Sequence, residues 1–276
     1  MFAKAVMARL AKPSNSTKPS TPDFCKGTVD MKKIVLVTAC ALLCAQSAMA
    51  QTNPDSRGFV IVNGGYQLSV NDFTDGATKR ENAEDGRFDS TYVVKGGPSV
   101  DVAGGAVLWR GLGVGVGFSR FSVSTPSTVT ASIPHPFFFN RARAVSGDAT
   151  DLKREEVAVH VQMRAVVPVG ARLQAMVFGG PSFFRVKQDM VTDVTYTDSY
   201  PYDVATFRTA TATAGSASKM GFNAGGDLAF FFTRQLGLGA TVQFAGTTVE
   251  MPAAGGTQRD VKVGGVQAGG GLRLRF

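Results

Sequence analysis

Apolar and other side chains alternate along much of this chain. In its last stretch, residues 264–276, one face carries Val266, Leu272, Leu274 and Phe276, and the other carries Arg273 and Arg275. The same alternation recurs in residues 112–118, 157–164, 222–230 and 236–244. Successive side chains of a strand point to opposite faces of a sheet. The pattern therefore predicts five strands that each have one apolar face.

Three less regular segments, residues 57–70, 97–110 and 171–187, bring the predicted number of strands to eight. The expected connections alternate in length. Short turns are expected at residues 109–112, 168–171 and 233–235, and long loops at residues 71–96, 124–154, 188–217 and 249–260. An even number of strands with short turns at one end and long loops at the other is typical of outer-membrane barrels.

The second face of each strand decides which side of this barrel meets lipid. A soluble barrel shows the same alternation but places its apolar face inside. Its outer face would then need many Lys, Glu and Thr residues, whereas here the second face is largely Gly, Ala, Ser and Gln. Such small residues fit the narrow interior of eight strands, and closure satisfies every backbone group in lipid. We predict an all-β, eight-stranded antiparallel up-and-down transmembrane β-barrel.

Aromatic residues are expected near both ends of the apolar belt, where amphipathic rings sit at headgroup level. If the chain enters the barrel from the periplasm, the strand directions predict an outer girdle of Tyr66, Phe118, Phe222 and Phe244. Either Phe183 or Phe184 should join it. The opposite girdle would hold Phe230, Phe232 and Phe276, about 25 Å away.

The front of the chain predicts export. Residues 31–50 combine Lys32 and Lys33, an apolar run and the small-residue site Ala48-Met49-Ala50, which is the pattern of a secretory signal. We expect cleavage after Ala50, which leaves residues 51–276 as the barrel domain. Residues 1–30 are rich in Pro, Ser and Thr, and we expect them to be a spurious or disordered extension.

This trimming changes the charge. The whole chain has a formal net charge of +8, but residues 1–50 hold seven Lys and Arg against two Asp, so residues 51–276 carry about +3. We therefore expect no nucleic-acid partner. All three cysteines, Cys25, Cys40 and Cys44, also precede residue 51, so the mature protein should have no disulfide.

The sequence gives no cofactor motif. The run GLGVGVG at residues 111–117 has glycines at every second position, which is a strand face rather than the spacing of a phosphate-binding loop. We expect neither a cofactor nor a metal.

Polar side chains of the predicted strands should point into the barrel. They are Asp101, His160, Gln162, Arg164, Asp227, Gln243, Gln267, Arg273 and Arg275. Charges of both signs are tolerable there only when they pair and bond. We favour a polar plug that closes the lumen over a narrow solute path, because eight strands leave no aqueous channel once side chains are placed.

Catalysis is not favoured. An enzyme on this fold needs a His beside a Ser, or paired carboxylates near the rim. The chain has only His135, which lies between two prolines in an expected loop, and His160, for which the spacing places no serine nucleophile.

Two of the expected loops stand out. Residues 132–144 combine Phe137, Phe138 and Phe139 with Arg141 and Arg143. This set is a candidate contact that either packs over the barrel mouth or binds a lipid, lipopolysaccharide or host surface. Residues 190–214 alternate on both sides of residues 199–202, which predicts a hairpin that extends above the membrane.

Residues 57–276 resemble the small eight-stranded outer-membrane barrels of the OmpA and OmpX type. The most specific marker is the last strand, with Leu272 and Leu274 leading to the terminal Phe276. The resemblance implies that this strand is an assembly signal read by the barrel-assembly machinery. We also expect a monomer among lipids and lipopolysaccharide in the outer membrane of a Gram-negative-type bacterium. We expect a non-catalytic structural or surface-interaction role through the loops; a small-solute pore and a lipid-modifying enzyme are the alternatives.

Overall fold

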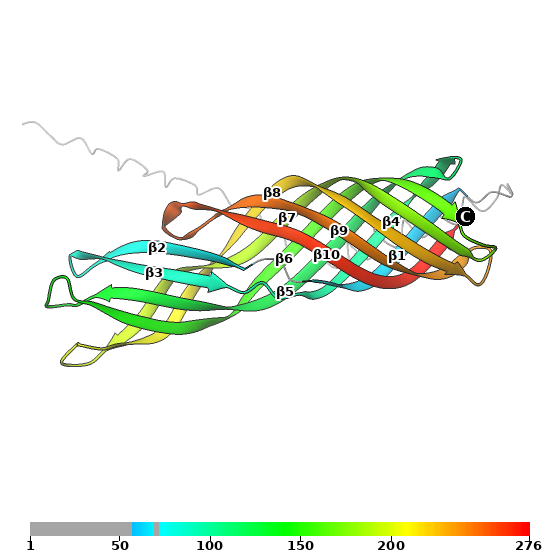
Figure 1. The fold of residues 1–276 in the computed structure, drawn as a ribbon. Coiled ribbons are helices and arrows are strands. Elements are labelled where there is room, and N and C mark those ends of the chain that lie inside the picture. Colours follow the sequence, from blue (N-terminus) through cyan, green and yellow to red (C-terminus); the bar gives the residue numbers. More distant parts are fainter. Residues whose placement is uncertain (1–56, 69–71) are drawn as a thin grey trace, which may run out of the picture. The chain divides into compact units, whose positions relative to one another are not determined.

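A computed structural model describes residues 57–68 and 72–276, so the expectations for residues 1–30 and 31–50 lie outside the described residues. The described residues form ten strands and one short 3₁₀ turn (Figure 1). They are β1 (Gly58–Gln67), β2 (Phe73–Glu81), β3 (Glu84–Tyr92), β4 (Gly97–Trp109), β5 (Leu112–Pro134), β6 (Ala142–Pro168), β7 (Leu173–Asp198), β8 (Ala205–Phe231), β9 (Leu236–Pro252), η2 (Ala254–Gly256) and β10 (Gln258–Arg275). No helix in this part of the chain is long and apolar enough to cross a membrane.

Eight of these strands close into a ring. The hydrogen-bonded order runs β5-β4-β1-β10-β9-β8-β7-β6, and β6 pairs again with β5. Every ladder is antiparallel, and the first and last strands are joined from Phe59 opposite Arg275 to Gln67 opposite Gln267. The predicted eight-stranded antiparallel barrel is therefore confirmed.

One end of the ring, here called the base, carries the short turns. β4 and β5 are joined by Arg110 and Gly111 alone, and both take positive φ angles, 46° and 83°. Residues 169–172 and 232–235 make the other two connections. All three short turns lie where the sequence predicts them. Gly58 and Phe276 also meet at the base, through N–H···O bonds of 2.7 and 2.9 Å.

The opposite end differs from the expectation of long loops. Residues 124–154 are mostly strand, because β5 and β6 continue until only residues 135–141 separate them, and β9 and β10 likewise leave only a short connection around η2. Residues 71–96 hold the β2–β3 hairpin, whose β3 pairs with β5. The predicted hairpin around residues 199–202 is confirmed. We call β2, β3 and residues 123–134, 142–156, 185–198 and 205–219 the extension.

Side-chain polarity inverts between the ring and the extension. In β6, Val159, Val161 and Met163 point outward and are exposed, whereas Val145 and Leu152 of the same strand are buried. The ring thus has an apolar outside and a polar inside, and the extension has the reverse. An apolar outer surface suits contact with lipid. An apolar core beneath a polar surface suits a structure surrounded by water. The prediction of a loop at residues 124–154 was wrong. These residues also alternate, but their apolar side chains point inward, whereas those of the ring point outward.

The extension has a hydrophobic core of its own. Tyr92 of β3, Val129 of β5 and Val191 of β7 are fully buried in one cluster. The amide of Val191 donates to the Tyr92 hydroxyl at 2.7 Å, and burial raises the pKa of Tyr92 to about 12. A second cluster, with Val186, Val249 and Met251, lies next to the ring. The extension is therefore packed rather than composed of independent loops.

The β2–β3 hairpin is fixed to β7 and to η2. Lys79 of β2 donates to Asp193 of β7 at 2.8 Å, which raises the pKa of Lys79. Tyr196 of β7 donates to Glu81 of β2 at 2.6 Å, and burial together with this carboxylate raises the pKa of Tyr196. Asp75 accepts from the amide of Ala254 at 3.0 Å. These contacts hold the hairpin against the rest of the extension.

Candidate functional site: the polar lumen and the aromatic tip

The structure places the nine predicted lumen residues on the inner face of the ring. Seven are buried, Asp101 is partly exposed, and Arg275 is partly exposed at the base. Their side chains do not scatter but join three hydrogen-bonded networks, which follow one another from the base toward the extension. Arg275 is the exception, because it stacks over Phe231 at the base, 4.0 Å from the ring centroid.

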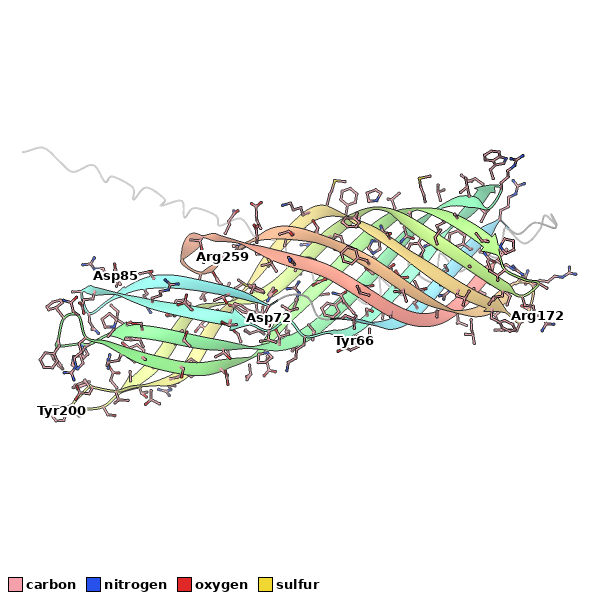
Figure 2. All side chains as sticks on the ribbon, in the orientation of Figure 1. Tyr66, Asp72, Asp85, Arg172, Tyr200 and Arg259 are labelled. Carbon is pink, nitrogen blue, oxygen red and sulfur yellow. The ribbon has the colours of Figure 1, made fainter. Side chains whose placement is uncertain are left out.

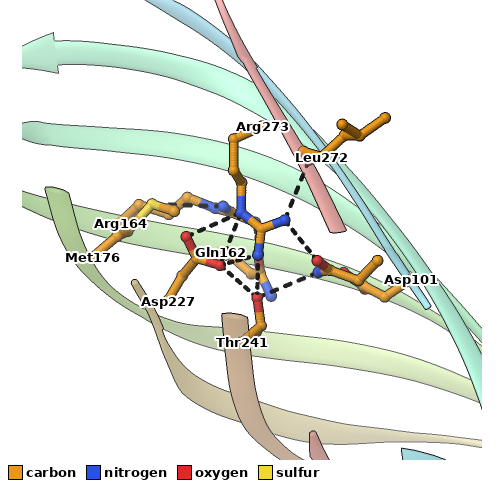
Figure 3. Close-up of polar contacts among 9 residues, drawn as sticks. Asp101, Gln162, Arg164, Met176, Asp227, Thr241, Leu272 and Arg273 are labelled. Atoms are coloured by element: carbon orange, nitrogen blue, oxygen red, sulfur yellow. Dashed lines mark hydrogen bonds and ion pairs between the residues drawn. The ribbon is translucent and has the colours of Figure 1, made fainter. Parts of the chain in front are cut away.

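The first network surrounds Arg273 (Figure 3). The Arg273 guanidinium bonds both carboxylate oxygens of Asp227, and it donates to Thr241 at 2.8 Å and to Asn63 at 2.7 Å. Thr241 donates to Asp227 at 2.5 Å, and Asn63 donates to Asp101 at 3.2 Å. Each buried charge of this group therefore has a hydrogen-bonding partner.

The second network crosses the lumen from β6. Arg164 donates to Gln162, and Gln162 donates to Asn223 at 2.9 Å. Asn223 donates to Ser182 at 2.8 Å. Arg164 also lies over the rings of Phe59 and Phe178, 4.7 and 5.1 Å from their centroids. Within the described residues no carboxylate forms an ion pair with Arg164, and its guanidinium is held by an amide and two aromatic faces.

His160 extends the second network, and here the sequence expectation was wrong. The spacing placed no serine beside it, yet Ser119 lies 2.9 Å from Nε2 and Ser182 lies 2.7 Å from Nδ1. All three side chains are buried. Each ring nitrogen faces a hydroxyl, so no carboxylate orients the imidazole as a Ser-His-Asp triad requires. The geometry favours a structural histidine.

The third network lies where the ring meets the extension. Arg154 donates to Glu156 at 2.6 Å, to Gln188 at 2.7 Å and to the carbonyl of Lys262 at 2.6 Å. Glu156 in turn accepts from Gln67 and from the amide of Gly264. The predicted residues Gln243 and Gln267 extend this network: Gln267 donates to Gln67 at 2.6 Å, and Gln243 donates to Gln267 at 3.0 Å.

Together the three networks take side chains from all eight ring strands. Sequence reasoning missed nine of these residues, namely Asn63, Gln67, Ser119, Arg154, Glu156, Ser182, Gln188, Asn223 and Thr241. The missed signal was parity, because they share the strand face of a predicted lumen residue or of its ladder partner. Arg154 and Glu156, for example, lie on the same inward face of β6 as His160.

The aromatic tip, residues 135–141 with residues 199–204, ends the extension (Figure 2, where Tyr200 is labelled). Phe137, Phe138, Phe139 and Tyr200 are exposed. Buried His135 organises the turn, since its Nδ1 accepts from the amides of Phe137 and Phe138 at 3.1 and 3.2 Å.

The two arginines predicted for the tip differ in their surroundings. Arg141 is exposed, lies over the Phe138 ring and pairs with Asp203 at 3.1 Å. Arg143 is buried and donates to Asp198 at 2.8 Å and to the carbonyl of Pro134 at 3.1 Å. Arg141 is therefore open to a partner, whereas Arg143 holds the β6 side of the turn to β7.

The predicted girdle residues Tyr66, Phe118, Phe222 and Phe244 point outward from the ring and are exposed. Phe183 joins them on the outside, whereas Phe184 is buried. Phe230, Phe232 and Phe276 are also exposed. The separation of the two sets into bands stays a prediction.

The last strand presents its predicted assembly signal on the outer face. Leu272, Leu274 and Phe276 are exposed, while Arg273 between them points inward. The Phe276 ring lies against Gly58, where an added Cβ would come within 2.5 Å of it. No group of three or more His, Cys, Asp or Glu within the described ranges is placed to hold a metal ion.

No protein-family model and no curated protein matches the chain. Among solved structures, Neisserial surface protein A is 10% identical with a TM-score of 0.37, covering 79% of this chain and 97% of that one. Ail, the attachment invasion locus protein of Yersinia pestis, in complex with the heparin analogue sucrose octasulfate, is 13% identical with a TM-score of 0.33, covering 79% and 99%.

Proposed function

We propose that this chain is a non-catalytic barrel of the outer membrane of a Gram-negative-type bacterium, with a surface-interaction role. The inversion of polarity along β5–β8 carries the proposal. A membrane-spanning strand needs about 9–11 residues, but β6 and β8 each have 27. Only the ring portion of each strand has the apolar outside that lipid requires, so the extension stands in water beyond the membrane.

The proposed orientation puts the base in the periplasm and the extension outside the cell. Lipids and lipopolysaccharide surround the apolar belt, and the barrel-assembly machinery reads Leu272, Leu274 and Phe276. The protein acts as a monomer, because the closed ring has no free edge within the membrane.

The interaction surface is the aromatic tip. Arg143, which the sequence also suggested as a contact, is buried beside it. Aromatic residues and arginine are enriched in protein interfaces relative to the rest of the surface. Their exposure is also unusual for a water-facing turn. The turn of the tip is held by His135, so less ordering entropy is lost when a partner binds.

The pore alternative is disfavoured by the three networks, which we interpret as the polar plug. Ions would have to separate the buried pairs of Arg273 with Asp227 and of Arg154 with Glu156. Planar-bilayer recordings test this point: discrete conductance steps that disappear in an empty-detergent control would support the pore instead.

Orientation is tested by labelling single cysteines on intact cells. The three natural cysteines, all within residues 1–50, are changed to serine, and Tyr200→Cys or Arg172→Cys is introduced. A membrane-impermeant maleimide should label Tyr200→Cys on intact cells and Arg172→Cys only after lysis. The reverse pattern, or labelling of both sites on intact cells, would overturn the orientation.

The role of the tip is tested by adhesion. Cells that display the wild-type protein are compared with cells that display F139S/Y200S on a mammalian cell monolayer. Thr206→Ala, an exposed change on β8, is the control. We expect adhesion to fall at equal surface labelling only for the tip variant. Unchanged adhesion would count against the tip as the contact.

A further inference from the structure

The base of the barrel holds a large cavity. Its volume is about 880 Å³, and its lining includes Arg110 and Gly111 of one turn and Arg234 of another. Figure 2 labels Arg172 on the neighbouring turn of the same end. Pockets for small molecules usually have about 300–1,000 Å³. The space is therefore large enough for an organic ligand.

The inner wall of the cavity is apolar. Five bulky side chains line it: Phe59, Ile61, Val166, Met176 and Phe231. The floor is the pair of Asp227 and Arg273, whose hydrogen bonds close the first lumen network. An apolar group placed in the cavity would displace water from these side chains.

Arginines surround the opening. Arg57, Arg110, Arg234 and Arg275 line the cavity, and none of them forms an ion pair within residues 57–68 and 72–276. The lining contains one carboxylate, Asp227, and Arg273 already neutralises it. The terminal carboxylate lies nearby, with a Phe276 oxygen accepting from the amide of Gly58 at 2.7 Å. Four arginines around one cavity create a positive potential that attracts anions.

Arg275 is held in position before any ligand arrives. Its guanidinium lies over Phe231, 4.0 Å from the ring centroid, and its Nε donates to the carbonyl of Arg234 at 2.5 Å. Its two terminal nitrogens make no hydrogen bond with the described part of the chain. They are thus free for a carboxylate or phosphate, which guanidinium groups bind in a bidentate manner.

We propose that the base cavity binds a small amphipathic anion, with a carboxylate or phosphate head at the arginines and a short apolar tail against Phe59, Ile61 and Met176. Charge selects the head, and the apolar wall selects the tail. Neither an inorganic anion nor a neutral alcohol satisfies both parts. The site is separate from the tip, and its test uses no cells.

Trp109 gives the test a direct signal, since it is the only tryptophan of the chain and it lines the cavity. The full barrel domain, refolded in a non-ionic detergent, is titrated with octanoate while Trp109 fluorescence is recorded. We expect a saturable change with octanoate and with octyl phosphate. The ligand with the lower dissociation constant identifies the preferred head group. Octanol and inorganic phosphate should give no saturable change.

Matched arginine variants separate the cavity from the micelle. R57Q/R275Q should weaken octanoate binding at least about tenfold, because two charge-assisted contacts are lost. Arg172→Gln removes a charge from the same end of the barrel but not from the cavity, and it should bind as the wild type does. If R57Q/R275Q does not refold, Arg57→Gln alone, outside every ladder, serves as the variant. Equal responses of octanol and octanoate, or equal affinities of the cavity variant and Arg172→Gln, would overturn the proposal.

Discussion

Arg273 of β10 and Asp227 of β8 form a buried ion pair although β9 lies between their strands. Thr241 of β9 bonds to both side chains and completes the bridge. The contact therefore joins three consecutive strands through the lumen, in addition to their backbone ladders. Its energetic role can be separated from that of the ladders by changing one partner or both.

Asp227→Asn should destabilise the barrel strongly, because it leaves the Arg273 charge buried without compensation. Removal of one partner of a buried pair costs about 3–5 kcal/mol, whereas replacement of both by apolar residues is often nearly neutral. D227L/R273M should therefore be more stable than Asp227→Asn. Urea unfolding in detergent measures this, with the folded fraction read from the faster migration of unboiled barrel on a gel. A double variant less stable than the single variant would contradict the prediction. The same gel tests the closed barrel, because wild-type protein that migrates identically before and after boiling would contradict it.

Phe183 and Phe184 are adjacent in β7 and point to opposite faces, which makes them a matched pair. Phe184 is 4% exposed and Phe183 is 52% exposed. Phe184→Ala should cost about 3–5 kcal/mol of unfolding free energy, because it opens a cavity in a packed cluster. Phe183→Ala should cost clearly less in detergent. Urea midpoints of the two variants in the same detergent test this, and equal losses would mean that the outward position of Phe183 is wrong.

The sequence predicted the ring well because lipid imposes a simple rule, apolar outside, on every strand that crosses it. It predicted the extension poorly. Residues such as Val129 and Val145 alternate as strictly as the belt does, but with the inward phase of a water-soluble sheet. The pattern of lipid-facing strands therefore ends where the apolar side chains turn from the outer to the inner face.

The partners of lumen residues were harder to predict than their inward orientation. The alternation of side chains along β6 is enough to predict that His160 points inward. That Ser119 and Ser182 meet it depends on the registers of β5 with β6 and of β6 with β7, which place Gly117 and Ser182 opposite His160. Register follows from turn geometry and from the stagger of the whole barrel rather than from any one strand. The base cavity escaped prediction for the same reason.

Tyr92 should make the extension sensitive to alkaline pH. Burial raises the pKa of Tyr92 from 10.0 to about 12, so the folded state favours the neutral phenol. Its contribution to stability is fully present below pH 10 and is lost as the pH rises toward 12. Tyr92→Phe should remove this part of the alkaline loss. At neutral pH it should cost about 1–3 kcal/mol, because the buried amide of Val191 loses its acceptor.

Unfolding free energies of wild type and Tyr92→Phe between pH 8 and pH 11.5 provide the measurement. Tyr200→Phe is the control, because that ring is 87% exposed at the tip. The difference between wild type and Tyr92→Phe should shrink as the pH rises, while Tyr200→Phe should follow the wild type throughout. A difference that is constant with pH would show that Tyr92 does not ionise on unfolding in this range.

Removal of Phe276 should separate assembly from stability. In the folded barrel Phe276 adds two backbone bonds with Gly58 to a β1–β10 ladder that already holds nine paired positions. Loss of one terminal residue should therefore leave refolding in detergent largely intact. If the barrel-assembly machinery reads the terminal aromatic, the amount inserted in the outer membrane of cells should nevertheless fall several-fold. Phe232→Ala, another exposed aromatic at the base, is the matched control and should lower neither quantity. Equal losses in refolding and in cellular insertion would assign Phe276 to stability, and normal cellular levels would remove its role as an address.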